Sequence, residues 1–191
     1  MDPLQTRKTP KQTRSKIMVK NILEASIRIL RELPFEKFTT NRVAERAGIS
    51  VGSLYQYFPN KKAILYELEK KAINHMIKKV KRLLFDNNYS AEKRMYNAIE
   101  YFFVTESSFY EITSSSEMDY SDHLKEIKET MDCFLRKNDY IDKHSGDFLA
   151  DYLVTFISSM AEQVGLRKDR STIKLWIQKT FDTVMKIIEK N

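Results

Sequence analysis

Glycine and proline are scarce in this sequence, with four of each among 191 residues. An all-β fold needs frequent tight turns that depend on these residues, so the shortage favours a chain made mostly of helices. The single cysteine, Cys133, excludes a disulfide framework or a thiolate metal site within one chain. No stretch approaches the roughly 18 uninterrupted apolar residues of a membrane span, and the N-terminus lacks an apolar signal-peptide core. We therefore expect a soluble, cytoplasmic protein that does not contact a membrane.

The sequence also lacks the recognisable parts of an enzyme. It has no glycine-rich phosphate loop, no zinc-binding histidine pair and no nucleophile elbow, and its three histidines lie far apart. His123 and His144 have polar neighbours, and we expect both on the surface. One acidic cluster has no regular ligand spacing; it comprises Glu111, Glu117, Asp119 and Asp122. We expect no catalytic residue, no metal site and no cofactor.

Charge is distributed unevenly along the chain. Residues 1–62 contain 13 Lys or Arg and five Asp or Glu, a net charge of +8, whereas the other 129 residues carry a net charge of −1. Basic charge on one short segment is typical of a module that binds phosphates. A solvated, lysine-rich surface that binds nothing would have the same net charge.

The sequence of the first third of the chain predicts a series of helices with suitable capping residues. Apolar residues at spacings of three and four predict a helix over residues 16–33, which Pro34 ends. Thr39 is a suitable N-cap for a short second helix that Gly48 would end in a left-handed conformation. Ser50 can cap a third helix that reaches Phe58, before Pro59. Asn60 can cap a much longer fourth helix, over residues 61–85.

The rest of the chain is also helical in pattern but less sharply bounded. We expect helices over 91–106 and 122–137, a broken or loop-containing segment over 107–121 and a polar connection over 138–146. Two strongly apolar helices close the chain. The fold class is therefore all-α, with a flexible basic arm at 1–15, a first helical segment at 16–60 and a larger helical segment at 61–191.

The segment from Thr40 to Phe58 has the lengths of a helix-turn-helix, in which the second helix enters the major groove of DNA. Gly48 allows the tight turn, because glycine adopts the left-handed conformation without steric strain. Gly52 stands in the first turn of the reading helix, where it lowers helix propensity, so a close approach of DNA to the backbone is a plausible compensation. Leu54 and Phe58 are expected in the core of this domain.

These residues resemble a known family of regulators. The run from Phe38 to Phe58 reads FTTNRVAERAGISVGSLYQYF and is followed by PNKKAIL. It closely resembles the N-terminal domain of TetR-family regulators, whose members are all-helical homodimers. In these proteins a three-helix head binds DNA, and a larger C-terminal domain binds ligands and dimerises through its last two long helices. The sharp resemblance spans about residues 16–66, and it implies a DNA-binding domain at 16–60 and a helical regulatory and dimerisation domain at 61–191.

The resemblance implies a set of DNA contacts. Thr40, Tyr55, Tyr57, Lys61 and Lys62 would contact phosphates, and Gln56 would read adenine through its amide. Tyr57 stands where many members have histidine, which puts its particular contact in doubt. The predicted DNA-binding residues are Thr39, Thr40, Ser50, Val51, Gly52, Ser53, Tyr55, Gln56, Tyr57, Lys61 and Lys62. Thr39 and Ser50 are also suited to act only as caps.

For the C-terminal region the resemblance implies a ligand pocket and a dimer interface. Aromatic side chains that would line an apolar pocket are Phe102, Phe103, Phe109, Tyr110, Phe134, Tyr152 and Phe156, although each also fits a plain helical core. Side chains expected at the interface of the last two helices are Leu149, Leu153, Phe156, Met160, Ile173, Trp176, Ile177, Phe181 and Val184.

Three functions follow from these patterns. The first is a repressor that binds a (pseudo)palindromic operator as a homodimer and is released by a small apolar or aromatic effector. The second is a DNA-binding protein without such an effector, which organises DNA or binds a protein partner. The third is a helical interaction or ligand-carrying protein, which the charge of residues 1–62 disfavours. A cavity with inward-facing polar groups would favour the first over the second.

Overall fold

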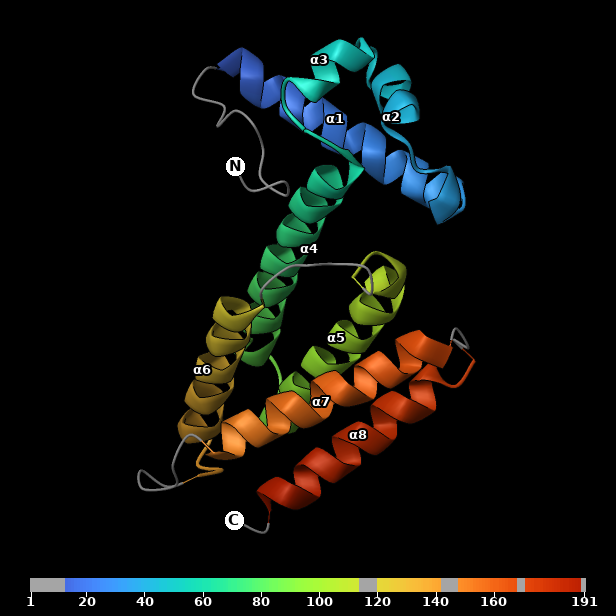
Figure 1. Cartoon of the computed structure of the whole chain (residues 1–191). Coiled ribbons are helices and arrows are strands. Elements are labelled where there is room, and N and C mark those ends of the chain that lie inside the picture. Colours follow the sequence, from blue (N-terminus) through green and yellow to red (C-terminus); the bar gives the residue numbers. More distant parts are fainter. Residues whose placement is uncertain (1–12, 114–119, 142–147, 168–170, 190–191) are drawn as a thin grey trace. The chain divides into compact units, whose positions relative to one another are not determined.

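The computed structural model describes residues 13–113, 120–141, 148–167 and 171–189, and its described part is all-helical, as expected (Figure 1). A short 3-10 helix at Phe35–Lys37 accompanies the α-helices. The α-helices are α1 (Thr13–Glu32), α2 (Thr40–Ala47), α3 (Val51–Tyr55), α4 (Lys61–Leu84), α5 (Ala91–Thr113), α6 (Ser121–Lys137), α7 (Phe148–Arg167) and α8 (Ile173–Ile188). None of the described helices has both the length and the apolar character needed to cross a membrane.

The chain divides into two compact units, with the division inside α4 between Ala72 and Ile73. The sequence had suggested a domain boundary at residue 60. The later division has a clear cause, because Ala63, Ile64 and Leu68 on the first turns of α4 are buried in the N-terminal core. Each unit has its own apolar cluster.

The N-terminal unit consists of α1, α2, α3 and the start of α4. Its fully buried side chains include Ile22, Phe38, Val43, Leu54 and Phe58. The prediction of Leu54 and Phe58 as core residues is therefore confirmed. α1 begins at Thr13 and thus takes in the end of the expected arm, whereas residues 1–12 lie outside the described part of the chain.

The predicted caps are confirmed. The Thr39 side chain accepts a hydrogen bond from the backbone N–H of Arg42, and Ser50 accepts one from Ser53. Asn60 Oδ1 accepts from the N–H of Ala63 at 2.9 Å. Gly48 ends α2 with a φ of 69°, in the left-handed region. Each cap satisfies a backbone group that a helix end would otherwise leave without a partner.

The third helix is shorter than predicted. It ends at Tyr55, and Gln56 is its C-cap residue, whereas the sequence suggested a helix that reaches Phe58. The N–H groups of Tyr57 and Phe58 both bond to the carbonyl of Leu54, which tightens the chain into a turn. Pro59 disfavours the helical conformation of the residue before it, so the helix cannot continue through Phe58.

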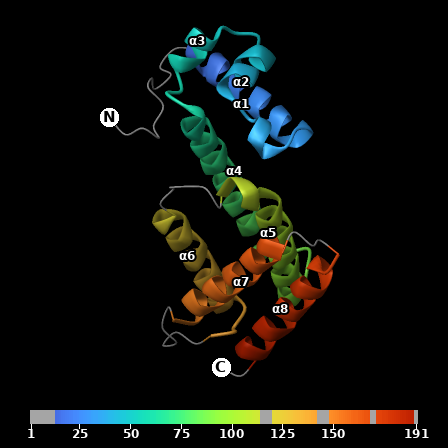
Figure 2. The same cartoon turned by 45° about the vertical axis from the view of Figure 1, so that its right-hand side comes forward.

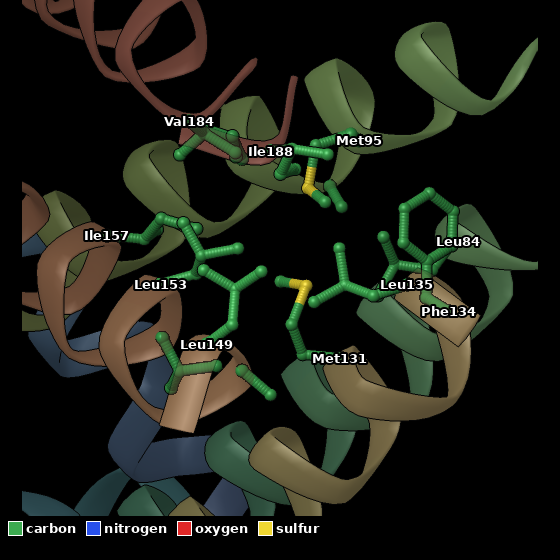
Figure 3. Close-up of a cluster of buried hydrophobic side chains, with 14 of the residues drawn as sticks. Leu84, Met95, Met131, Phe134, Leu135, Leu149, Leu153, Ile157, Val184 and Ile188 are labelled. Carbon is green, nitrogen blue, oxygen red and sulfur yellow. The ribbon is translucent and has the colours of Figure 1, made fainter. Parts of the chain in front are cut away.

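The C-terminal unit is built around α7, which packs against α5, α6 and α8. α7 and α8 run side by side in both views (Figures 1 and 2). Figure 3 shows the core that they share with the end of α4: Leu84 and Leu135 lie on one side of it, and Leu153 and Ile157 lie on the other. α7 is apolar on several sides because it is surrounded by three other helices.

The expected break over residues 107–121 is wrong in its first part. α5 continues as a helix to Thr113, and α6 begins at Ser121. Residues 114–119 and 142–147 lie outside the described part of the chain, and His144 is among them. Serine has only a mildly unfavourable helix propensity, so a serine-rich end can remain helical.

A buried arginine holds one end of this unit together. Arg94 is 8% exposed; its guanidinium donates to the carbonyl of Leu84 at 3.3 Å and to Asn138 Oδ1 at 2.7 Å. It also lies over the ring of Phe134, 5.5 Å from the ring centroid. These contacts join the ends of α4 and α6 to the start of α5. The hydrogen bonds also compensate for the burial of the charged Arg94 guanidinium.

Candidate DNA-binding surface and ligand cavity

Helices α2 and α3 form a helix-turn-helix whose turn is set by Gly48. The N–H of Gly48 bonds to the carbonyls of Ala44 and Glu45, and the N–H of Ile49 bonds to that of Ala44. A Cβ atom at Gly48 would meet no neighbour within 4 Å. Glycine is needed there for its positive φ and not for space.

The hydroxyl groups of Thr40 and Tyr55 meet across this motif. Thr40 Oγ1 lies 3.2 Å from Tyr55 Oη, and either oxygen can donate. The pair connects the N-terminus of α2 with the end of α3, and Tyr55 is 39% exposed. Hydroxyl donors beside a helix N-terminus are suited to hold a phosphate, since the free N–H groups there favour an anion.

The first turn of α3 presents small side chains. Ser50 Oγ accepts from the N–H of Ser53 at 3.0 Å and lies 2.8 Å from Ser53 Oγ. Gly52 is exposed, and a Cβ there would meet nothing nearer than Ser50 Oγ, at 3.8 Å. Nothing within the chain therefore requires glycine at this position. Val51 is half-buried against the core of the unit.

The other predicted contact residues lie after α3. Gln56 is exposed at the end of that helix, whereas Tyr57 is half-buried and packs against the core. Lys61 and Lys62 are exposed on the first turn of α4, and Lys61 Nζ lies over the Phe35 ring, 6.0 Å from its centroid. The structure thus places the polar candidates on one short segment around α3.

An open cavity lies in the C-terminal unit, between α4, α5, α6 and α7. Its volume is about 570 Å³. That volume is within the roughly 300–1,000 Å³ typical of small-molecule sites. Its lining residues are Ile73, Met76, Phe102, Glu106, Tyr120, His123, Leu124, Ile127, Thr155, Ser158, Ser159 and Glu162.

A smaller apolar cavity, of about 40 Å³, lies next to the first. Phe102, Ile127 and Ser158 line both, so the two are neighbours along the same walls. The small cavity is otherwise lined by Val80, Leu84, Met95, Ala98, Ile99, Met131, Val154 and Ile157. The larger cavity therefore has polar walls and an adjoining apolar end.

Most aromatic residues predicted to line a pocket are elsewhere. Phe103 and Phe134 are fully buried core residues, and Tyr152 is 46% exposed. Phe156 is half-buried and stacks on Tyr152 with the ring centroids 6.5 Å apart. Phe102 does line both cavities. The side chains of Phe109 and Tyr110 lie outside the described part of the structure.

The polar lining was missed by the sequence analysis. His123 was expected on the surface, but it lines the large cavity and its Nδ1 atom is buried. A sequence signal did exist on α7. This largely apolar helix carries a narrow polar stripe at helical spacing, made of Thr155, Ser158, Ser159 and Glu162. Such a stripe predicts a water-filled groove along one face of the helix.

The residues predicted for the interface fall into two groups. Leu149, Leu153, Ile177 and Val184 are buried in the chain's own core, which corrects their assignment to a surface between copies. Those that are half-buried are Phe156, Met160, Ile173, Trp176 and Phe181. Apolar surface on α7 and α8 comes instead from residues not predicted for the interface: Phe148, Tyr152 and Leu175 are 78%, 46% and 58% exposed.

Comparisons with known proteins match this arrangement. Residues 22–68 match the profile of the bacterial regulatory proteins of the tetR family. The chain is 29% identical over 83 residues to the fatty acid metabolism regulator protein of Bacillus subtilis. That alignment covers 44% of this chain and 42% of the regulator, so the chain spans less than half the length of this relative.

Two solved structures show the same fold over most of the chain. One is the transcriptional regulator FadR of Bacillus subtilis in complex with stearoyl-CoA, with a TM-score of 0.63, 16% identity, and coverage of 86% of this chain and 96% of that one. The other is the fatty acid degradation regulator FadR of Bacillus halodurans, with a TM-score of 0.59, 14% identity, and coverage of 85% and 97%. At these identities the likeness concerns the fold.

Proposed function

We propose that this chain, which carries the N-terminal domain of the tetR family of bacterial regulatory proteins, is a DNA-binding transcriptional regulator and not an enzyme. The observation that carries the proposal is the helix-turn-helix of α2 and α3, within the segment that matches the family. The cavity in the second unit supports a regulator that responds to a small molecule over one without an effector.

The segment around α3 would contact an operator in two ways. Thr40, Tyr55 and Lys61 supply hydroxyl and ammonium groups for phosphates, with Tyr57 and Lys62 beside them. Gln56 would read a base edge, since its amide can form two hydrogen bonds with adenine in the major groove. The side chains of Val51 and Gly52 offer no hydrogen-bonding group, so the shape of the DNA would contribute to the choice of site.

The regulator would act as a homodimer on a (pseudo)palindromic operator. One head covers a half-site, and two heads reach successive major grooves about 34 Å apart. Apolar side chains on the last two helices support an interface there: the exposed Phe148 and Tyr152 stack in a row with the half-buried Phe156 on α7, and Leu175 is exposed on α8. Sedimentation should then show a dimer at micromolar concentration; a monomer would contradict the dimeric mechanism.

Helix α4 offers a route from the cavity to the DNA-binding unit. Ile73 and Met76 line the cavity, and Leu68 on the same continuous helix is buried in the N-terminal core. A ligand that binds one position of α4 better than another would shift the population of head spacings. Release from the operator, and hence derepression, is the expected result.

The test of DNA binding is its salt dependence. An operator obtained by selection from random duplexes would be titrated with the wild-type chain and with Lys61→Ala at several salt concentrations. Loss of one phosphate contact per head should flatten the slope of log Kd against log salt by about one unit per head. Lys174→Ala, which removes an exposed lysine on α8, is the matched control and should leave the slope unchanged. Failure to select any operator would contradict the proposed function.

A further inference from the structure

Two carboxylates line the large cavity, and no lysine or arginine does so among the residues that the structure describes. The carboxylates belong to Glu106 on α5 and Glu162 on α7. Lys81 of α4 and Lys128 of α6 are held in ion pairs with Glu126 and Asp151 at 2.6 and 3.0 Å.

Two carboxylates on the walls of one cavity produce a negative electrostatic field there. A field of one sign attracts ligands of the opposite sign and disfavours ligands of its own. An anionic head group in this cavity would lose hydration beside two carboxylates without gaining a basic partner.

His123 provides an independent sign that the cavity receives a polar group. Its Nδ1 atom is buried and has no hydrogen-bond partner among the described residues. A buried nitrogen without a partner is costly unless a ligand or water satisfies it. Phe102 and Tyr120 line the same cavity, and aromatic rings attract organic cations.

The adjoining apolar cavity indicates the rest of the ligand. Its lining is apolar apart from Ser158, and it shares Phe102 and Ile127 with the charged cavity. A single ligand can therefore place a polar head near Glu106, His123 and Glu162 and rest apolar surface against the shared residues Phe102 and Ile127. Few polar groups on an apolar site are the usual means of fixing the orientation of such a ligand.

We propose that the effector of this regulator is an apolar or aromatic organic cation, with its positive charge held by Glu106 and Glu162. The inference rests on the proposed function, since it names the chemical class of the effector. A cationic effector would distinguish this chain from the structurally similar FadR in complex with stearoyl-CoA, because stearoyl-CoA carries phosphate groups. The fold is shared, but the charge of this cavity suits the opposite sign.

The experiment compares two dyes of similar shape and opposite charge. Rhodamine 6G is cationic and fluorescein anionic at neutral pH, and both can be titrated with the full chain, without DNA, by fluorescence anisotropy. Rhodamine 6G should bind at least about tenfold more tightly, as expected for one or two close charge interactions in a partly solvated site.

Substitutions then test the two carboxylates. Glu106→Gln should weaken rhodamine 6G binding about fivefold, and Glu162→Gln by less, because Glu162 is exposed and its charge is more screened. Glu100→Gln is the matched control, since Glu100 is an exposed acid on α5 that does not line either cavity. It should leave the affinity unchanged, and circular dichroism should show that all three variants remain folded.

The outcomes separate this inference from the proposed function. Equal affinity for the two dyes, no measurable binding of either, or cation binding unaffected by both glutamine variants would overturn the inference. If stearoyl-CoA binds and releases the operator whereas rhodamine 6G does not bind, the ligand-responsive regulator stands and the cationic effector is wrong. If no operator is found, the proposed function fails, and the dye titrations still decide the charge preference of the cavity.

Discussion

The two units of this chain assemble their candidate sites in different ways. In the N-terminal unit all the predicted DNA contacts lie between Thr39 and Lys62, and local helix caps fix their positions. In the C-terminal unit the cavity draws residues from α4, α5, α6 and α7, which are separated by up to 89 positions between Ile73 and Glu162. A site made from one continuous segment can be recognised in a sequence, whereas a site made from several helices depends on how they pack.

The same difference appears in the comparisons. The family profile matches residues within the N-terminal unit, whereas the solved structures share the fold of most of the chain at low identity. The second unit can thus keep its helices while its cavity carries other side chains. A shared fold does not fix the ligand, so the effector must be argued from the lining residues.

The largest expected effect tests whether the two units unfold separately. Phe58→Ala removes a fully buried ring from the N-terminal core and should lower the free energy of unfolding of that unit by about 3–5 kcal/mol. Trp176, the single tryptophan, lies on α8 and reports on the other unit. Urea titration should show an earlier loss of helical circular dichroism with little change in the Trp176 transition.

Phe134→Ala is the reciprocal variant, because Phe134 is equally buried in the C-terminal core. It should move the Trp176 transition to lower urea. If Phe58→Ala moved the Trp176 transition as far as the circular dichroism transition, the units would unfold as one, and the comparison between them would lose its energetic basis.

Next in size is the expected loss of base discrimination in Gln56→Ala. Loss of a bidentate contact should reduce discrimination at one base pair by about 1–3 kcal/mol, measured as the ratio of affinities for the operator and a singly substituted operator. Gln178→Ala on α8 is the matched control and should leave the ratio unchanged. An equal loss on specific and random DNA would remove Gln56 from the base-reading residues.

The two glycines of the helix-turn-helix should respond with opposite signs. Gly48→Ala places a side chain at a φ of 69° and should destabilise the unit by about 1 kcal/mol, whereas Gly52→Ala should stabilise it by about 0.5–1 kcal/mol through helix propensity. Thermal melts of the two variants provide the measurement. If DNA approaches the backbone at Gly52, then Gly52→Ala binds the operator more weakly despite its higher stability; unchanged affinity would rule out that approach.

The smallest expected effect concerns an exposed ion pair. Arg46 donates two hydrogen bonds to the Glu32 carboxylate, and these bonds, with the positive charges of Arg46 and Arg28, lower the pKa of Glu32 below its ordinary value. A lowered folded-state pKa gives stability that is present above the unfolded value of 4.5 and is lost as pH falls through the folded value.

The melting temperature of the wild type should therefore exceed that of Glu32→Gln near neutral pH, and the difference should vanish as the pH falls through the lowered folded-state pKa of Glu32. Both side chains are exposed, so the difference should be small and should shrink in high salt. A difference that grew as the pH fell would show that Arg46 is not the cause of the lowered pKa.

The sequence by itself determined much of the N-terminal unit. Thr39, Gly48, Ser50 and Asn60 predicted where its helices begin and end, because capping depends on residues within one turn of the helix end. The end of α3 at Tyr55 was missed: Pro59 disfavours a helical Phe58, but the bonds from Tyr57 and Phe58 to the Leu54 carbonyl decide how early the turn begins.

Tertiary structure alone decided what the C-terminal aromatics and His123 do. Helical spacing identified apolar residues correctly but could not tell which faced a core, a cavity or the surface: Phe103 is core, Phe102 lines the cavities and Tyr152 is exposed. The physical reason is that a helix buries whichever faces its neighbours cover, and those neighbours come from distant parts of the chain. The sequence therefore identified the helix-turn-helix, and only the packing of four helices placed Glu106, His123 and Glu162 around one cavity.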